Sequence, residues 1–440
     1  MKRLAIIYTL LLALAPAMSA MTITADEAVR MALQSDERIK SSENSIRQSE
    51  LQKGIARTAY LPNFSGSATS AWMLPDKKMD EMAMTMKMRG MYMAGISVTQ
   101  PIFAGGKILA ANKLASIGKR AAEQQLDLMR TSVAADAETS YWSYVAVLAK
   151  VEMMRSYAAQ VDTAWAQTKT ALDAGMATAT DLLRVEARQS QVHYQLQQAT
   201  AGADLCRMAL CTAIGVDTAT DLTPADKEIP LALPSDPEEY SLDNRPEMRL
   251  LQTDIDAKRQ QVAVTRADFL PSLGLSAGWS AYGNIKLNSM SPLPDGSGAV
   301  PTSQNIKGDG WNIMLSLQVP LFHWGEGVKK VRHAKIAVDN AILEKEHTGR
   351  MLDLQVRQAI SNLATGQQML VSAQKAMEQA EASLQSVARS YEYGLANLTE
   401  MLDAQSQWQT SQANLIEART QLRIYVIDYR VATATLLQAR

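Results

Sequence analysis

The chain has 440 residues, in which 44 lysines and arginines are balanced by 45 aspartates and glutamates. Nucleic-acid-binding proteins usually carry a basic excess, so this balance gives no reason to expect a nucleic-acid partner. Hydrophobic residues make up 47% of the chain but aromatic residues only 5%, whereas a compact core usually relies on more Phe, Tyr and Trp. No proline occurs between Pro101 and Pro224 or after Pro320, so much of the chain is free to form very long helices.

Residues 1–20 are predicted to form a cleaved secretory signal peptide. Lys2 and Arg3 precede a short apolar stretch that ends in small residues at Ala20. The alternative is a transmembrane anchor, but the stretch is shorter than the roughly 18–20 residues that such a helix needs. No other apolar run approaches this length, so any passage through a membrane is expected to use strands.

Three motifs occur twice, in the same order, in the two halves of the chain. They are Leu61-Pro62, Pro101-Ile102-Phe103 and Gly175 to Leu183 in the first half, and Leu270-Pro271, Pro320-Leu321-Phe322 and Gly394 to Leu402 in the second. The second and third motifs are 74 positions apart in both halves, measured from Pro101 to Gly175 and from Pro320 to Gly394. The spacing between the first two motifs varies. We interpret the chain as an internal duplication, with a rigid element in the constant interval and a loop in the variable one.

Each repeat is predicted to contain a β-hairpin and very long helices. Alternation of apolar with small or polar residues predicts the strands, and proline-free segments rich in Ala, Gln, Leu, Glu and Arg predict the helices. Repeat 1 spans 21–214, with strands at about 64–74 and 91–103, a long helix at about 107–172 and a return helix at 177–214. An equatorial connector spans 215–244. Repeat 2 spans 245–440, with a helix at about 245–268, strands at about 272–283 and 310–322, a long helix at about 327–391 and a return helix at 396–436. The polar segments 74–90 and 283–310 are expected to be hairpin tips.

Four strands are too few to close a barrel by themselves, and an open sheet with an apolar outer face leaves its edges unpaired. Each long helix would extend about 100 Å at 1.5 Å per residue, and helices of that length need lateral neighbours. The chain is therefore expected to form a cyclic homo-oligomer, which is hollow if the helices line a ring.

The repeated motifs, together with Asn244-Arg245-Pro246-Glu247 at the start of the second half, resemble the TolC family of outer-membrane efflux proteins. The resemblance covers nearly the whole chain after the signal peptide. It implies a mainly helical protein with a β-barrel contribution, in which a trimer builds a twelve-stranded outer-membrane barrel continued by a twelve-helix periplasmic tunnel. It also implies a passive duct without enzymatic activity or cofactors. Its partners would be outer-membrane lipid, a periplasmic adaptor (membrane fusion protein) and an inner-membrane pump of the RND or ABC type.

The resemblance also assigns roles to the two helical turns. The residues of the adaptor-docking tip would be Gly175, Thr180, Asp181, Gly394 and Thr399, and the entrance constriction would be formed by Glu400 and Asp403. Crowded carboxylates at a constriction repel one another and attract cations, so closure would be easier at low pH or with divalent ions. The alternatives are structural: acids are favoured in the first turn of a helix, threonines there cap the helix, and glycines supply positive φ at a helix end.

A methionine series suggests a metal site, which we do not expect. Met82, Met84, Met86 and Met88 carry soft thioether ligands suited to Cu(I) or Ag(I), but their spacing also fits one face of the extended hairpin. The four histidines follow no ligand spacing. Copper or silver efflux and type I protein secretion remain alternative roles. A periplasmic adaptor or coiled-coil protein is the non-channel alternative, although an adaptor has one helical hairpin and no duplicated order.

Overall fold

A computed structural model describes residues 21–81, 84–234, 240–294 and 296–438, without the side chains of 73–81, 84–89 and 292. The expected signal peptide lies outside these residues. The chain divides into two compact units. Of the described residues, the helical unit takes those in 21–45, 122–251 and 344–438, and the sheet unit takes those in 46–121 and 252–343.

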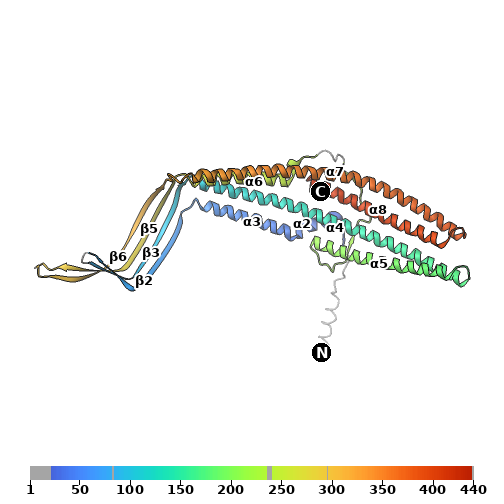
Figure 1. Cartoon of the computed structure of the whole chain (residues 1–440), viewed down its shortest axis with the longest axis horizontal. Coiled ribbons are helices and arrows are strands. Elements are labelled where there is room, and N and C mark those ends of the chain that lie inside the picture. Colours follow the sequence, from blue (N-terminus) through green and yellow to red (C-terminus); the bar gives the residue numbers. More distant parts are fainter. Residues whose placement is uncertain (1–20, 82–83, 235–239, 295, 439–440) are drawn as a thin grey trace, which may run out of the picture. The chain divides into compact units, whose positions relative to one another are not determined.

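The sheet unit contains four long antiparallel strands, which run side by side in the order β2-β3-β5-β6 (Figure 1). Their bounds are β2 Asn63–Glu81, β3 Met84–Ala104, β5 Ser272–Pro292 and β6 Ala299–Gln318. The strands thus continue through most of the segments 74–90 and 283–310 that were predicted to be tips, and this prediction was wrong. Polar residues there pair through their backbones, which an apolar alternation does not detect. β6 also ends before 319–322, where Pro320 has no N–H to donate.

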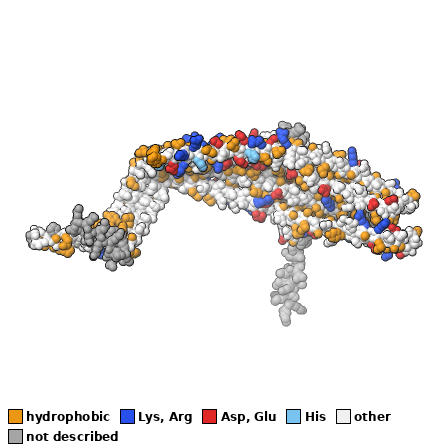
Figure 2. All heavy atoms as spheres, viewed as in Figure 1, with side chains coloured by type: hydrophobic (Ala, Val, Ile, Leu, Met, Phe, Trp, Pro, Cys, Tyr) orange, Lys and Arg blue, Asp and Glu red, His pale blue; other side chains and the backbone are white. Residues whose placement is uncertain are grey.

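One face of this sheet is apolar across all four strands. In the register, Ile96 of β3 lies opposite Trp279 of β5, which in turn lies opposite Trp311 of β6. Trp311 is 79% exposed, so the chain does not bury this face itself. In Figure 2, blue and red side chains lie over the helices, while the described part of the sheet is mostly white and orange. Within the described residues, β2 and β6 each pair on one side only, so both edges of the sheet are open.

Seven α-helices make up most of the rest of the described residues. They are α2 Ala25–Ser35, α3 Glu37–Thr58, α4 Lys107–Asp173, α5 Ala179–Ile214, α6 Pro246–Ala267, α7 Glu326–Glu392 and α8 Leu398–Ala432. The prediction of a mainly helical chain with long antiparallel helices and antiparallel strands is confirmed. Helices α2 and α3 were not predicted. In α3 only Ile39 and Ser42 are buried, so this helix lacks the apolar stripe that reveals an amphipathic helix.

In the helical unit, buried apolar side chains form core clusters between the helices. One cluster joins α7 to α8 around Val356, Leu422 and Val426, and a second packs α4 against α5 around Tyr157 and Val192. A buried ion pair also links α4 to α8: the guanidinium of Arg423 donates to the Glu138 carboxylate at 2.7 Å. The helical unit therefore has an interior of its own.

The connector contributes one strand to a small two-stranded sheet and docks on the helices. Strand β1 (Met21–Ile23) pairs in parallel with β4 (Leu222–Pro224), and the Tyr144 hydroxyl donates to the Leu222 carbonyl at 2.9 Å. A 3-10 helix, η1, follows at Leu242–Asn244. Next to it, the Tyr240 hydroxyl donates to the Asp353 carboxylate of α7 at 2.6 Å. The connector is thus tied to the helical unit at both ends.

Candidate functional site: the two helical turns

The first turn joins α4 to α5 and is closed by glycine. Gly175 has φ 75°, its N–H donates to the Leu172 carbonyl at 2.9 Å, and the Met176 N–H donates to the Ala171 carbonyl at 2.8 Å. These two bonds form a Schellman motif, which requires a left-handed residue at the position of Gly175. The helix therefore stops where glycine permits the reversal.

The second turn, between α7 and α8, repeats this geometry. Gly394 has φ 71°, its N–H donates to the Tyr391 carbonyl at 3.0 Å, and the Leu395 N–H donates to the Ser390 carbonyl at 2.8 Å. The interpretation of both glycines as positive-φ helix ends is confirmed. Two segments 219 positions apart therefore fold by the same local chemistry.

Capping boxes start the return helices, but not at the threonines that were considered as caps. The N-caps are Thr178 for α5 and Asn397 for α8, whereas Thr180 and Thr399 lie in the first helical turn. The capping interpretation of those two threonines was wrong. An N-cap side chain must reach the N–H three residues on, and the spacing from Thr178 to Asp181 satisfies this. A threonine followed three residues later by an acid is the sequence signature of a capping box, and Thr178 and Asp181 have this spacing.

The acid of each box is engaged with the backbone at the cap. Asp181 accepts hydrogen bonds from the Thr178 hydroxyl at 2.7 Å and N–H at 3.2 Å, and these bonds lower the pKa of its carboxyl. Glu400 accepts from the Asn397 N–H at 3.0 Å. Asp403 is exposed and makes no hydrogen bond or ion pair with the described part of the chain. The two acids expected to form the entrance constriction thus differ, because only Glu400 is held by the fold.

A cross-link between the two turns was missed from the sequence. The Arg184 guanidinium of α5 donates to the Thr399 hydroxyl of α8 at 3.1 Å. Beneath it lies a small apolar cluster that contains Val185 and Leu398. Arg184 lies nine positions after Gly175, and Asp403 lies nine positions after Gly394. The two turns therefore carry opposite charges at equivalent positions, which an alignment of the two motifs would have revealed.

Both turns expose large apolar side chains. Met176 and Leu395, each directly after its glycine, are 80% and 81% exposed, and Leu183 and Tyr393 are also largely exposed. Together with the arginine and the free carboxylate, they make a surface that combines apolar contact area with charges of both signs.

The described residues contain no group of side chains suited to hold a metal ion. No cluster of three His, Cys, Asp or Glu side chains occurs among the residues searched. Met82 lies outside the described residues, as do the side chains of Met84, Met86 and Met88, so the methionine prediction is untested. Among the described helices, none combines the length and the apolar character needed to cross a membrane.

The profile of the family described as outer membrane efflux protein matches residues 28–216 and 239–434. The chain belongs to this family. Efflux protein BepC of Brucella suis is 24% identical over 435 residues, covering 95% of the chain and 86% of that relative. Outer membrane protein TolC of Vibrio cholerae is 21% identical over 359 residues, covering 78% and 76%. A solved membrane protein from Pseudomonas aeruginosa superposes with a TM-score of 0.75 at 20% identity, covering 93% of each chain.

As a member of the outer membrane efflux protein family, this chain is a TolC-type channel of the outer membrane that extends into the periplasm. It is a transport protein and not an enzyme. The family resemblance inferred from the repeated motifs is confirmed.

Proposed function

We propose that three copies of the chain form a passive exit duct of a tripartite efflux or export system. Three four-stranded sheets would supply a twelve-stranded barrel in the outer membrane, and the helices would continue it as a twelve-helix periplasmic tunnel. The observation that carries this proposal is the sheet itself, which has two open edges and an exposed apolar face. Pairing β6 of one copy with β2 of the next satisfies both edges, and lipid covers the apolar face.

The partners follow from the same proposal. The duct would dock a periplasmic adaptor and, through it, an inner-membrane pump of the RND or ABC type. A supporting relative is the solvent efflux pump outer membrane protein SrpC of Pseudomonas putida, 22% identical over 380 residues, covering 82% of the chain and 74% of that relative. We also propose that the chain is a duplication, with repeat 1 at 21–214, the connector at 215–244 and repeat 2 at 245–440.

The two turns are proposed as the periplasmic end of the duct. The exposed side chains of Met176 and Leu395 give an adaptor apolar area to bury, and Gly175, Thr180, Asp181, Gly394 and Thr399 set the shape of the turns. Asp403 and Glu400 would narrow the entrance. Because Glu400 already accepts a bond from its N-cap, Asp403 is expected to contribute more to the field at the entrance.

Purification in detergent tests the assembly directly. The proposal expects a trimer by light scattering and discrete channels in a planar bilayer. A monodisperse monomer that is folded and soluble without detergent would contradict it, and would instead favour an adaptor or a coiled-coil protein.

Single-channel current tests the constriction. The variant Glu400→Ala/Asp403→Ala should conduct more and be blocked less by divalent cations, because two carboxylates per chain no longer attract or hold ions at the entrance. Asp403→Asn alone should give most of this effect and Glu400→Gln the smaller part. Unchanged current in the double variant would remove the constriction from the proposal while leaving the duct intact.

A further inference from the structure

At the second strand-to-helix corner, a tryptophan adopts a conformation that usually requires glycine. Trp324 has φ 50°, and at the equivalent corner of the first half Gly105 has φ 59°. A bulky residue in the left-handed region is strained, and such strain persists where another interaction favours that residue. Trp324 is 86% exposed, and its ring contacts the Phe322 ring edge-on, with 5.0 Å between the centroids. Burial within the described chain therefore does not explain why this tryptophan is present.

A hollow of about 680 Å³ lies beside this corner, within the sheet unit. Its floor is apolar and is formed by Phe269, Leu270, Leu321 and Val328. Its rim carries three exposed cations, Arg266, Arg332 and Lys335.

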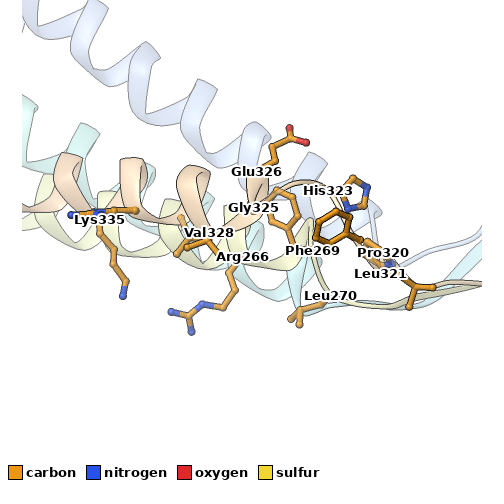
Figure 3. A pocket seen from close by; sticks show the side chains of 14 residues that line it. Arg266, Phe269, Leu270, Pro320, Leu321, His323, Gly325, Glu326, Val328 and Lys335 are labelled. Atoms are coloured by element: carbon orange, nitrogen blue, oxygen red, sulfur yellow. The ribbon is translucent and has the colours of Figure 1, made fainter.

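The charges around the hollow are not balanced. Its one acid, Glu326, forms an ion pair with Lys330 at 2.7 Å, whereas Arg266, Arg332 and Lys335 make no ion pair with any described residue. In Figure 3, the Arg266 and Lys335 side chains extend to the same side and Glu326 extends to the opposite side. The rim of the hollow therefore carries an excess of positive charge over an apolar floor, and two of its three cations, Arg266 and Lys335, extend to the same side.

We propose that this corner binds the headgroup of an anionic phospholipid, and the proposal rests on the proposed outer-membrane duct. Arg266 and Lys335 would hold the phosphate, because guanidinium and ammonium groups donate charge-assisted hydrogen bonds to phosphate oxygens. The acyl chains would lie along Leu321 and the neighbouring apolar residues. Trp324 would sit at the level of the headgroups, where aromatic side chains gather in membrane proteins.

Charge argues against a second copy of the chain as the occupant. The positions equivalent to Arg266, Arg332 and Lys335 in the first half are Arg57, Lys113 and Ser116, and the first two of these are exposed cations as well. Bringing the first corner of one copy against the second corner of another would set positive charge against positive charge. An anionic headgroup is complementary to both.

Native mass spectrometry of the detergent-purified full chain tests the proposal, with phosphatidylglycerol and phosphatidylcholine of identical acyl chains as probes. The wild-type protein should retain more phosphatidylglycerol than phosphatidylcholine. Arg266→Gln/Lys335→Gln should weaken its retention by about fivefold per charge removed and leave phosphatidylcholine unchanged. The matched control Arg350→Gln/Lys375→Gln removes one arginine and one lysine from exposed positions on α7, the helix that carries Lys335, and should behave as wild type.

Trp324→Gly restores the residue found at the first corner and avoids strain. It should lower the retention of both lipids while keeping the preference for phosphatidylglycerol. Retention equal to wild type in the Arg266/Lys335 variant would overturn the headgroup site. If the Arg266/Lys335 variant dissociates into monomers but still retains phosphatidylglycerol, the corner is a contact between copies of the chain, and the proposal is overturned as well. Channel conductance, measured in parallel, separates failure of the lipid site from failure of the proposed duct.

Discussion

The helical unit and the sheet unit differ in whether their apolar side chains are buried within one copy of the chain. In the helical unit, Tyr141, Tyr157 and Leu422 are almost fully buried within one copy of the chain. In the sheet unit, Trp311, Ile313 and Leu317 lie on an exposed apolar face. The difference indicates that the first unit is stabilised by its own core, whereas the apolar face of the second must be covered from outside the chain.

The largest expected effect is in the core of the helical unit. Glu138→Ala removes the partner of Arg423 and leaves a buried guanidinium without that carboxylate, which should cost about 3–5 kcal/mol of stability. Thermal unfolding followed by far-ultraviolet circular dichroism in detergent would measure the loss.

Glu152→Ala is the control on the same helix α4. Its ion pair with Arg155 is largely exposed, at 3.7 Å, so its loss should cost less than about 1 kcal/mol. Similar destabilisation by both variants would mean that the buried pair does not support the core as described.

The dependence of the sheet unit on lipid is tested by two neighbouring residues of β6. Ile313 lies on the apolar face and Met314 on the other. Ile313→Lys should destabilise the protein in phospholipid vesicles by about 2–4 kcal/mol, because it places a charge against hydrocarbon. Met314→Lys should have little effect. Urea unfolding monitored by tryptophan fluorescence would compare them, and equal losses would contradict the assignment of the lipid-facing side.

The smallest effect is expected at the turns, where the nearby buried cluster has only three members, Ala164, Val185 and Leu398. Thr178→Ala should weaken the start of α5 by about 1 kcal/mol, whereas Thr180→Ala should be nearly neutral because Thr180 is not the N-cap. Amide hydrogen exchange in the first turn of α5 would measure both variants. A larger effect at Thr180 would contradict the capping box.

The same turn should depend on pH. The pKa of Asp181 is lowered in the folded state by its bonds from Thr178, so the box stabilises the turn above the unfolded pKa of about 3.9 and is lost as pH falls through the folded value. Asp181→Asn should remove this dependence. Protection that stays unchanged down to acidic pH in the wild type would exclude a role for the ionised carboxylate.

The long helices could be predicted because the residues that end them lie at the helix ends themselves. Gly175 and Gly394 end α4 and α7 through backbone geometry, and the proline-free intervals leave no other stop. The apolar face of the sheet was predictable for the same reason, since alternation around Trp279 and Trp311 records which side faces away from water.

The features that were missed depend on pairing between segments distant in sequence. The ladder that extends β2 and β3 through polar residues depends on the backbone of the partner strand. The bond from Arg184 to Thr399 depends on how two hairpins pack together. The polar helix α3 has too few apolar residues for periodicity to reveal it. The hollow near Trp324 is lined by residues of both α6 and α7, and Arg266 and Lys335 on its rim are distant in sequence.

The pairing of β1 with β4 also bears on how quickly the protein reaches its native state. Met21 lies opposite Leu222, so about 200 residues must be in place before this contact forms. The core cluster that contains Val426 of α8 is completed later still. Contacts between such distant positions fold slowly and leave apolar segments exposed in the meantime. The helical unit should therefore mature late, after export of nearly the whole chain, and periplasmic chaperones should have their greatest effect in that interval.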